Sequence, residues 1–67
     1  MRKFLIVKTE DGYVNCVTND VYHVGSFDKN DAVKFPYDIS YKEYKHICDD
    51  LHTSGFENVE FILCFNQ

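Results

Sequence analysis

The stretch SYKEYKHICDDLHTSG, residues 40–55, decides the fold, because it has a clear helical period. Its larger apolar side chains recur at intervals of three and four residues, which places them on one face of an α-helix. The members of this stripe are Tyr41, Tyr44, Ile47, Cys48 and Leu51. Ser40 followed by Glu43 is a capping-box pattern for the start of the helix, and Gly55 suits the left-handed residue after its end. The sequence therefore predicts one helix with a single core-facing side.

Extended segments with alternating or β-branched residues lie on both sides of the predicted helix. We expect four strands: Lys3 to Thr9, Tyr13 to Thr18, Val21 to Phe27 and Val59 to Phe65. Asp11-Gly12, between the first two strands, is a strong signal for a two-residue hairpin turn. With that turn Val7 lies opposite Cys16, whereas a three-residue loop would shift the register by one and exchange the faces of the second strand.

The order of these elements predicts an α+β domain of the β-β-β-α-β type. Asn19-Asp20 supplies a second turn, so the first three strands form an antiparallel meander. Residues 28–39 contain a polar run and Pro36, and we expect a loop there. A helix that doubles back over the sheet would deliver the fourth strand beside the first and parallel to it, in the order 3-2-1-4. We expect residues 1–67 to form this one small domain.

A single helix can cover only one face of such a sheet. On the helix side we expect Leu5, Val7, Val14, Cys16, Val59, Phe61, Leu63 and Phe65. The other face then carries Phe4, Ile6, Tyr13, Val17, Ile62 and Cys64. So many apolar side chains do not suit a face open to water, so either residues 28–39 fold across it or another molecule covers it. We therefore assign partner binding to this face, through Phe4, Ile6, Tyr13, Val17 and Ile62.

Composition and charge argue against several classes of function. The chain has 11 acidic and 7 basic residues, a net charge of −4, and no basic run, which argues against a nucleic-acid backbone as the partner. No Gly-rich nucleotide-binding motif occurs. No apolar stretch reaches membrane-spanning length, so we expect no membrane association. Cys16, Cys48 and Cys64 lack a CxxC spacing, which predicts buried, reduced thiols and a cytoplasmic setting.

The helix carries a group of conceivable metal ligands, His46, Asp49 and Asp50. They fall on its solvent side, and two carboxylates with one imidazole do not make a closed ligand set. Cys48 and His52 are a poor nucleophile pair, because Cys48 points toward the core. We therefore predict no enzyme activity, no metal site and no cofactor. Asp49 and Asp50 lie near the helix C-terminus, against its dipole, and are either a tolerated solvated surface or an acidic patch for a partner.

Tyr13, Tyr22 and Phe27, on the second and third strands, suggest an alternative function. Such aromatic side chains can stack on the bases of a single-stranded nucleic acid, normally beside basic residues that follow its backbone. Lys29 and Lys34 are the nearby basic candidates, and they lie among acidic residues. Packing within the sheet is the commoner role of such tyrosines, so nucleic-acid binding is our second hypothesis.

A small acidic domain rich in Lys, Asn, Asp, Tyr and Phe resembles, in composition, the accessory proteins encoded by phages and other mobile elements of low-GC bacteria. This resemblance rests on no particular residues. It implies stoichiometric binding to a host protein, for example inhibition of a defence nuclease, rather than catalysis. Our first hypothesis is thus a non-enzymatic protein-binding module that also self-associates as a homodimer. It would contact its partner through the second sheet face or through Asp49 and Asp50.

Overall fold

The elements of the fold follow the predicted order, with two short additions. The computed structural model describes residues 2–66. The strands are β1 (Arg2–Thr9), β2 (Gly12–Thr18), β3 (Val21–Ser26), β4 (Phe35–Pro36) and β5 (Val59–Asn66). A 3₁₀ helix, η1 (Lys29–Asp31), precedes β4, and the α-helix α1 (Tyr41–Thr53) precedes β5. The predicted α+β class is confirmed, and β5 is the predicted fourth strand.

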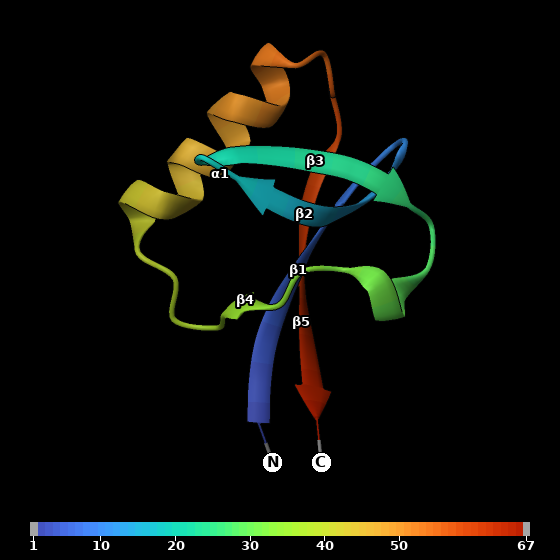
Figure 1. Ribbon diagram of the computed structural model, residues 1–67. Helices are drawn as coiled ribbons and strands as arrows, with labels where there is room; N and C mark the ends of the chain where they lie inside the picture. The colour runs from blue at the N-terminus through green and yellow to red at the C-terminus, as the bar shows by residue number, and fades with distance from the viewer. Residues whose placement is uncertain (1, 67) are drawn as a thin grey trace.

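The long strands are neighbours in the predicted order, β3, β2, β1 and β5, and the two-residue β4 also pairs with β1 (Figure 1). β5 pairs with β1 over eight successive residues, from Thr9↔Val59 to Arg2↔Asn66. This pairing is antiparallel. The parallel direction predicted for the last strand is therefore wrong.

The path of residues 28–39 explains the reversed direction of β5. The sequence predicts a loop for this segment and a helix that returns along the sheet, so that the last strand starts at the same end as β1. Instead the segment itself returns, because β4 pairs with Phe4 and Leu5 near the beginning of β1. α1 therefore starts at that end and runs toward the other, and β5 comes back antiparallel to β1 (Figure 1).

The same segment fills an opening within the sheet. β1 and β2 pair only beside their turn, where Lys8 lies opposite Tyr13. Farther along, β2 crosses away from β1, and its Val14 carbonyl accepts the N–H of Val33 at 2.9 Å. β4 takes the place beside β1 that β2 has left. Backbone groups exposed by the divergence of the two strands are thus satisfied from residues 33–36, as buried backbone groups require.

The β1–β2 turn is displaced by one residue from its predicted position. Its central residues are Glu10 and Asp11 rather than Asp11 and Gly12. The Thr9 hydroxyl closes the turn by accepting the Asp11 N–H at 3.1 Å and donating to the Gly12 carbonyl at 2.9 Å. Gly12 has φ 121°, and a Cβ there would lie 2.5 Å from the Ser26 carbonyl oxygen. Only glycine fits this position without strain.

The positive φ angles of a type I′ turn occur between β2 and β3, at Asn19 (51°) and Asp20 (63°). The β2–β3 ladder has register shifts on both sides of Val14. The second shift breaks the alternation between Val14 and Cys16, as a β-bulge does. Cys16 is consequently exposed, and its thiol lies 3.4 Å from Thr18 Oγ1. The predicted burial of Cys16 is wrong for this reason.

Both predicted ends of α1 are confirmed. The Ser40 hydroxyl accepts the N–H of Glu43 at 3.2 Å. Gly55 has φ 101°, and its N–H and that of the following residue donate to carbonyls of the last helical turn, each at 3.0 Å. This pair of bonds is a Schellman motif. The bonds join residues that are close in the chain, which is why the local sequence predicts them.

The helix-side core lies under the C-terminal half of α1. Its buried members are Val7, Val14, Tyr22, Phe35, Ile47 and Leu51. β1 and β5 extend well past the helix (Figure 1). Leu63 and Phe65, which we predicted under the helix, are therefore exposed, and so are Tyr41 and Tyr44 of the helical stripe. In residues 2–66 no helix has the length and apolar character needed to cross a membrane.

Candidate functional site

The sheet face opposite α1 is covered from within the domain. Ile6 and Cys64 are buried there together with Ala32, which comes from the segment after η1. Phe4, Tyr13 and Ile62 pack around these three. Of the two alternatives left open by the sequence, the structure has one part of residues 28–39, at Ala32, over this face, whereas Val33 and Phe35 of the same segment pack in the helix-side core. Ile6, which we predicted as a partner contact, is 1% exposed and lies within this small core.

Val17, the remaining residue assigned to this face, lies apart from the cluster. It is exposed on β2, beyond the register shifts that surround Val14. The structure therefore brings together Phe4, Ile6, Tyr13 and Ile62 from the predicted partner-binding set, and separates Val17 from them. Their common role is a second small core under η1.

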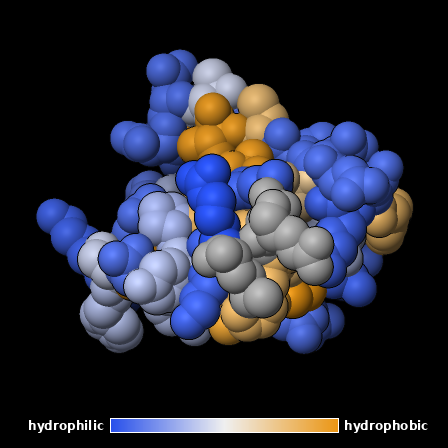
Figure 2. All heavy atoms as spheres, turned by 90° about the horizontal axis from the view of Figure 1, so that it is seen from below, coloured by the Kyte–Doolittle hydropathy of each residue, from blue (hydrophilic) through white to orange (hydrophobic). Residues whose placement is uncertain are grey.

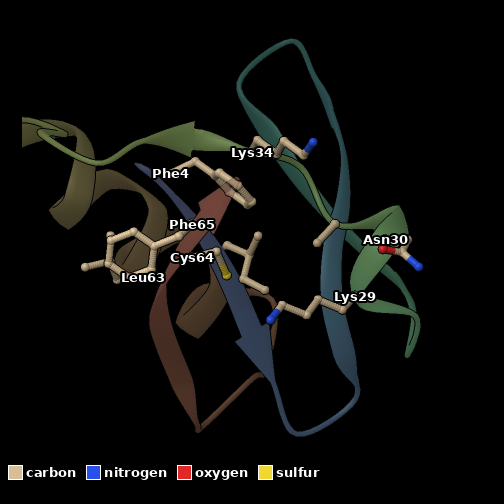
Figure 3. A pocket seen from close by; sticks show the side chains of 9 residues that line it. Phe4, Lys29, Asn30, Lys34, Leu63, Cys64 and Phe65 are labelled. Atoms are coloured by element: carbon tan, nitrogen blue, oxygen red, sulfur yellow. The ribbon is translucent and has the colours of Figure 1, made fainter. Parts of the chain in front are cut away.

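A hollow of about 550 Å³ lies beside this cluster, between β5 and η1, and residues from both faces of β5 line it (Figure 3). Its lining residues are Phe4, Ile6, Lys29, Asn30, Ala32, Lys34, Leu63, Cys64 and Phe65. The Lys34 ammonium lies 5.1 Å from the centre of the Phe4 ring, a cation–π contact. The floor is thus apolar, and the wall formed by the segment after β3 carries two positive charges. No acidic residue is among those that line this hollow.

Apolar side chains are exposed in a row along α1 and β5. Tyr41 (76% exposed) stacks on Tyr44 (42%) with 6.3 Å between ring centres, and Tyr44 contacts the Phe61 ring at 4.7 Å. Phe61, Leu63 and Phe65 are alternate residues of β5 and share one side of the sheet. Leu63 is 49% and Phe65 56% exposed. We call these five residues the apolar strip.

Sequence reasoning assigned the whole apolar strip to the core. One available signal pointed the other way: a tyrosine keeps a polar hydroxyl, and two of them at the start of a helix suit a half-wet surface. Cys48 raises the pKa of the Tyr44 hydroxyl, first through its charge and then through a hydrogen bond. Viewed from the end where β1 begins and β5 ends, hydrophobic residues reach the surface among hydrophilic ones (Figure 2).

β5 presents a free edge beside the apolar strip. Within residues 2–66 its only strand neighbour is β1, and their eight pairs show no register shift. Its sequence has neither glycine nor proline, and Glu60 is its only charged residue. The outward backbone N–H and C=O groups of such a strand are a template for pairing with another strand.

The acidic end of α1 is used partly inside the domain. The Asp50 carboxylate accepts the N–H of Tyr22 at 3.2 Å and so holds β3 against the helix. Asp49 is exposed. The two neighbouring carboxylates therefore have different surroundings, and the predicted acidic patch is reduced to Asp49.

The predicted stacking platform for nucleic acid does not assemble. Tyr22 is buried in the helix-side core, whereas Tyr13 packs against the cluster on the opposite sheet face. Phe27 is exposed beyond the end of β3. Tyr13 and Tyr22 lie on different faces of the sheet, so the three side chains do not form one surface.

The remaining candidates for metal binding or catalysis, His46 and the cysteines, are placed as follows. The His46 ring packs edge-on against Tyr22, with 5.7 Å between ring centres. In residues 2–66 no group of three or more His, Cys, Asp or Glu side chains is arranged to hold a metal ion. Cys64 is buried, as predicted, and Cys48 is half-buried.

Comparison with known proteins adds no relative: no family model, curated protein or solved structure matches this chain. The apolar strip and the free edge of β5 are therefore the features on which a functional assignment rests. Both lie on the same side of the domain, since Phe61, Leu63 and Phe65 belong to β5 itself.

Proposed function

We propose that this domain is a non-enzymatic protein-binding module whose contact surface is the apolar strip with the free edge of β5. The observation that carries the proposal is the exposure of Tyr41, Tyr44, Leu63 and Phe65 next to an unprotected edge strand. Large apolar side chains gathered on one side of a small domain are typical of an interaction site. Aromatic side chains are also enriched at protein interfaces.

The size of the surface suits a specific contact. Burial of a side chain such as Leu63 or Phe65 contributes roughly 1.5–3 kcal/mol before the cost of association is subtracted. Several such side chains, together with backbone hydrogen bonds to an added strand, suffice for a complex of about micromolar affinity. The rings of Tyr41 and Tyr44 are stacked with 6.3 Å between their centres, so a partner would meet them as one adjoining aromatic surface.

The biological role we propose is that of an accessory or inhibitory protein of a phage or mobile element, which acts by stoichiometric binding to a host protein. The resemblance in composition supports this role. A cytoplasmic location is part of the proposal, because three free thiols, one of them exposed, suit a reducing compartment.

The test is a comparison of tagged variants as bait in lysates of candidate hosts. Phe65→Asp and Tyr41→Asp each place a charge in the apolar strip, and Val21→Asp is the matched control, because Val21 is 44% exposed on β3. We expect a stoichiometric partner that wild type and Val21→Asp retain and both strip variants lose. Equal recovery by all four proteins would contradict the proposed surface, and circular dichroism would verify that each variant is folded.

A further inference from the structure

The chemistry of β5 itself points to what covers its free edge. Natural edge strands are guarded against pairing by charges, proline, bulges or short length. β5 has eight residues, no bulge against β1, and one charge at its second position. We propose that a second copy of this chain pairs with β5 in antiparallel fashion, with Leu63 on the twofold axis. The inference uses the same side of the domain as the proposed function and adds a specific partner, the chain itself.

The sequence of β5 is complementary to itself in this register. In an antiparallel pair, directly opposite residues share a face of the sheet. With Leu63 opposite the partner's Leu63, Phe61 lies opposite the partner's Phe65 and Ile62 opposite the partner's Cys64. All these pairs are apolar. The symmetry repeats each contact, as a closed dimer requires.

The charges are also compatible with this register. Glu60 falls opposite position 66 of the partner, so the two copies of Glu60 do not face each other. Position 66 pairs with Arg2 on the other side. Arg2 of one copy and Glu60 of the other therefore lie in one cross-strand row, two strand spacings or about 10 Å apart. Long side chains of opposite charge can meet across that distance.

The neighbouring antiparallel register, with Ile62 on the axis, is less favourable. It would place the partner's Glu60 opposite Cys64, which is buried in the small core with Ile6 and Ala32. A carboxylate beside this apolar cluster would lose hydration without gaining a hydrogen-bonded partner there. In this register Phe65 would also lie opposite the partner's Val59, whose side chain is smaller than that of the partner's Phe61.

Sedimentation equilibrium of the full chain from about 1 µM to 1 mM tests the dimer, because this range covers the affinities that a small interface supports. Leu63→Lys puts two like charges on the axis, and Val21→Lys is the control with similar exposure on β3. We expect a concentration-dependent wild-type dimer whose Kd rises at least about 100-fold in Leu63→Lys, since like charges in an interface cost several kcal/mol. Val21→Lys should match wild type.

The register is tested by thiol cross-linking in a Cys16→Ser background, which removes the exposed native thiol. Leu63→Cys should oxidise to a covalent dimer, because opposite positions of an antiparallel pair fit disulfide geometry. Val21→Cys on β3 should not. For Ile62→Cys, peptide mapping should find position 62 linked to the partner's Cys64, and a link between the two positions 62 would overturn the register.

A wild-type chain that stays monomeric at about 1 mM would overturn the dimer, and so would a Kd unchanged in Leu63→Lys. Neither result touches the proposed function, because a different protein can still use the apolar strip. Conversely, equal recovery of host proteins by wild type and all bait variants would contradict the proposed function, whereas a dimer measured by sedimentation would still be valid.

Discussion

β3 and β5 form the two outer edges of the same sheet. They differ in how far other parts of the domain bond to their outward backbone groups. β3 has six residues and pairs with β2 through a ladder that shifts register twice. One of its outward N–H groups, that of Tyr22, is taken by the Asp50 carboxylate of α1. β5 has eight residues in uninterrupted register and, within residues 2–66, no neighbour on its outer side.

The difference follows from the length and position of α1. A helix of 13 residues is about 20 Å long, whereas an eight-residue strand spans about 27 Å. The middle of α1 and its last turn lie against β3, where His46 and Asp50 contact Tyr22. The far half of β5 extends past the helix and keeps Leu63 and Phe65 in water. The single helix therefore contacts the outer strand β3 at Tyr22 and leaves the outer edge of β5 without a strand neighbour within residues 2–66.

The largest expected effect contrasts the covered sheet face with the open edge. Ile6→Lys buries a charge under Ala32 and should lower the free energy of unfolding by at least about 3 kcal/mol. The same change at Leu63, which is half exposed, should cost the monomer under about 1 kcal/mol. Urea melts at low protein concentration measure both values. Similar losses in the two variants would mean that the edge of β5 is not open.

A smaller effect is expected at the protected edge. Asp50→Ala leaves the Tyr22 N–H without its acceptor and should cost about 1–3 kcal/mol. The control, Asp49→Ala, changes an exposed neighbour and should stay within about 0.5 kcal/mol. Hydrogen exchange at the Tyr22 amide should accelerate in the first variant only. Equal melts for the two variants would show that Asp50 does not close β3.

The smallest effect concerns the start of β5 and depends on pH. The Glu10 carboxylate accepts the N–H groups of Glu57 at 2.8 Å and Asn58 at 3.1 Å, just before β5. The bond from Glu57 is the main cause that lowers the pKa of Glu10 below its ordinary value of 4.5. A lowered pKa in the folded state adds stability that is fully present above the unfolded pKa and is lost as pH falls through the folded one.

Glu10→Gln should therefore be less stable than wild type near neutral pH, and the difference should shrink below about pH 4. Urea melts of both proteins across this range measure it. The Glu10 carboxylate is exposed, so this change in the free energy of unfolding should be smaller than those expected for Ile6→Lys and Asp50→Ala. A gap that stays constant with pH would show that the carboxylate does not anchor the segment before β5.

The sequence by itself determined the helix and its ends. Ser40 and Gly55 act through hydrogen bonds to residues no more than a few positions away, so their roles can be read without knowledge of the fold. Alternation of apolar residues likewise predicted the strands and the shared face of Phe4, Ile6, Tyr13 and Ile62. Each of these depends on local periodicity.

Only the tertiary structure decided the direction of β5, the cover over Ile6 and the surface of the candidate site. The direction of β5 depends on the two-residue strand β4, whose pairing with β1 no local pattern indicates. The bond from Tyr22 to Asp50 joins residues 28 positions apart. Leu63 and Phe65 follow the alternating pattern that is typical of residues buried on one face of a strand. They are exposed because α1 does not extend over this part of β5 (Figure 1). Burial depends on which elements pack against each other in space. The alternation of apolar residues along a strand identifies the face that can be buried, but not how far the helix extends over it.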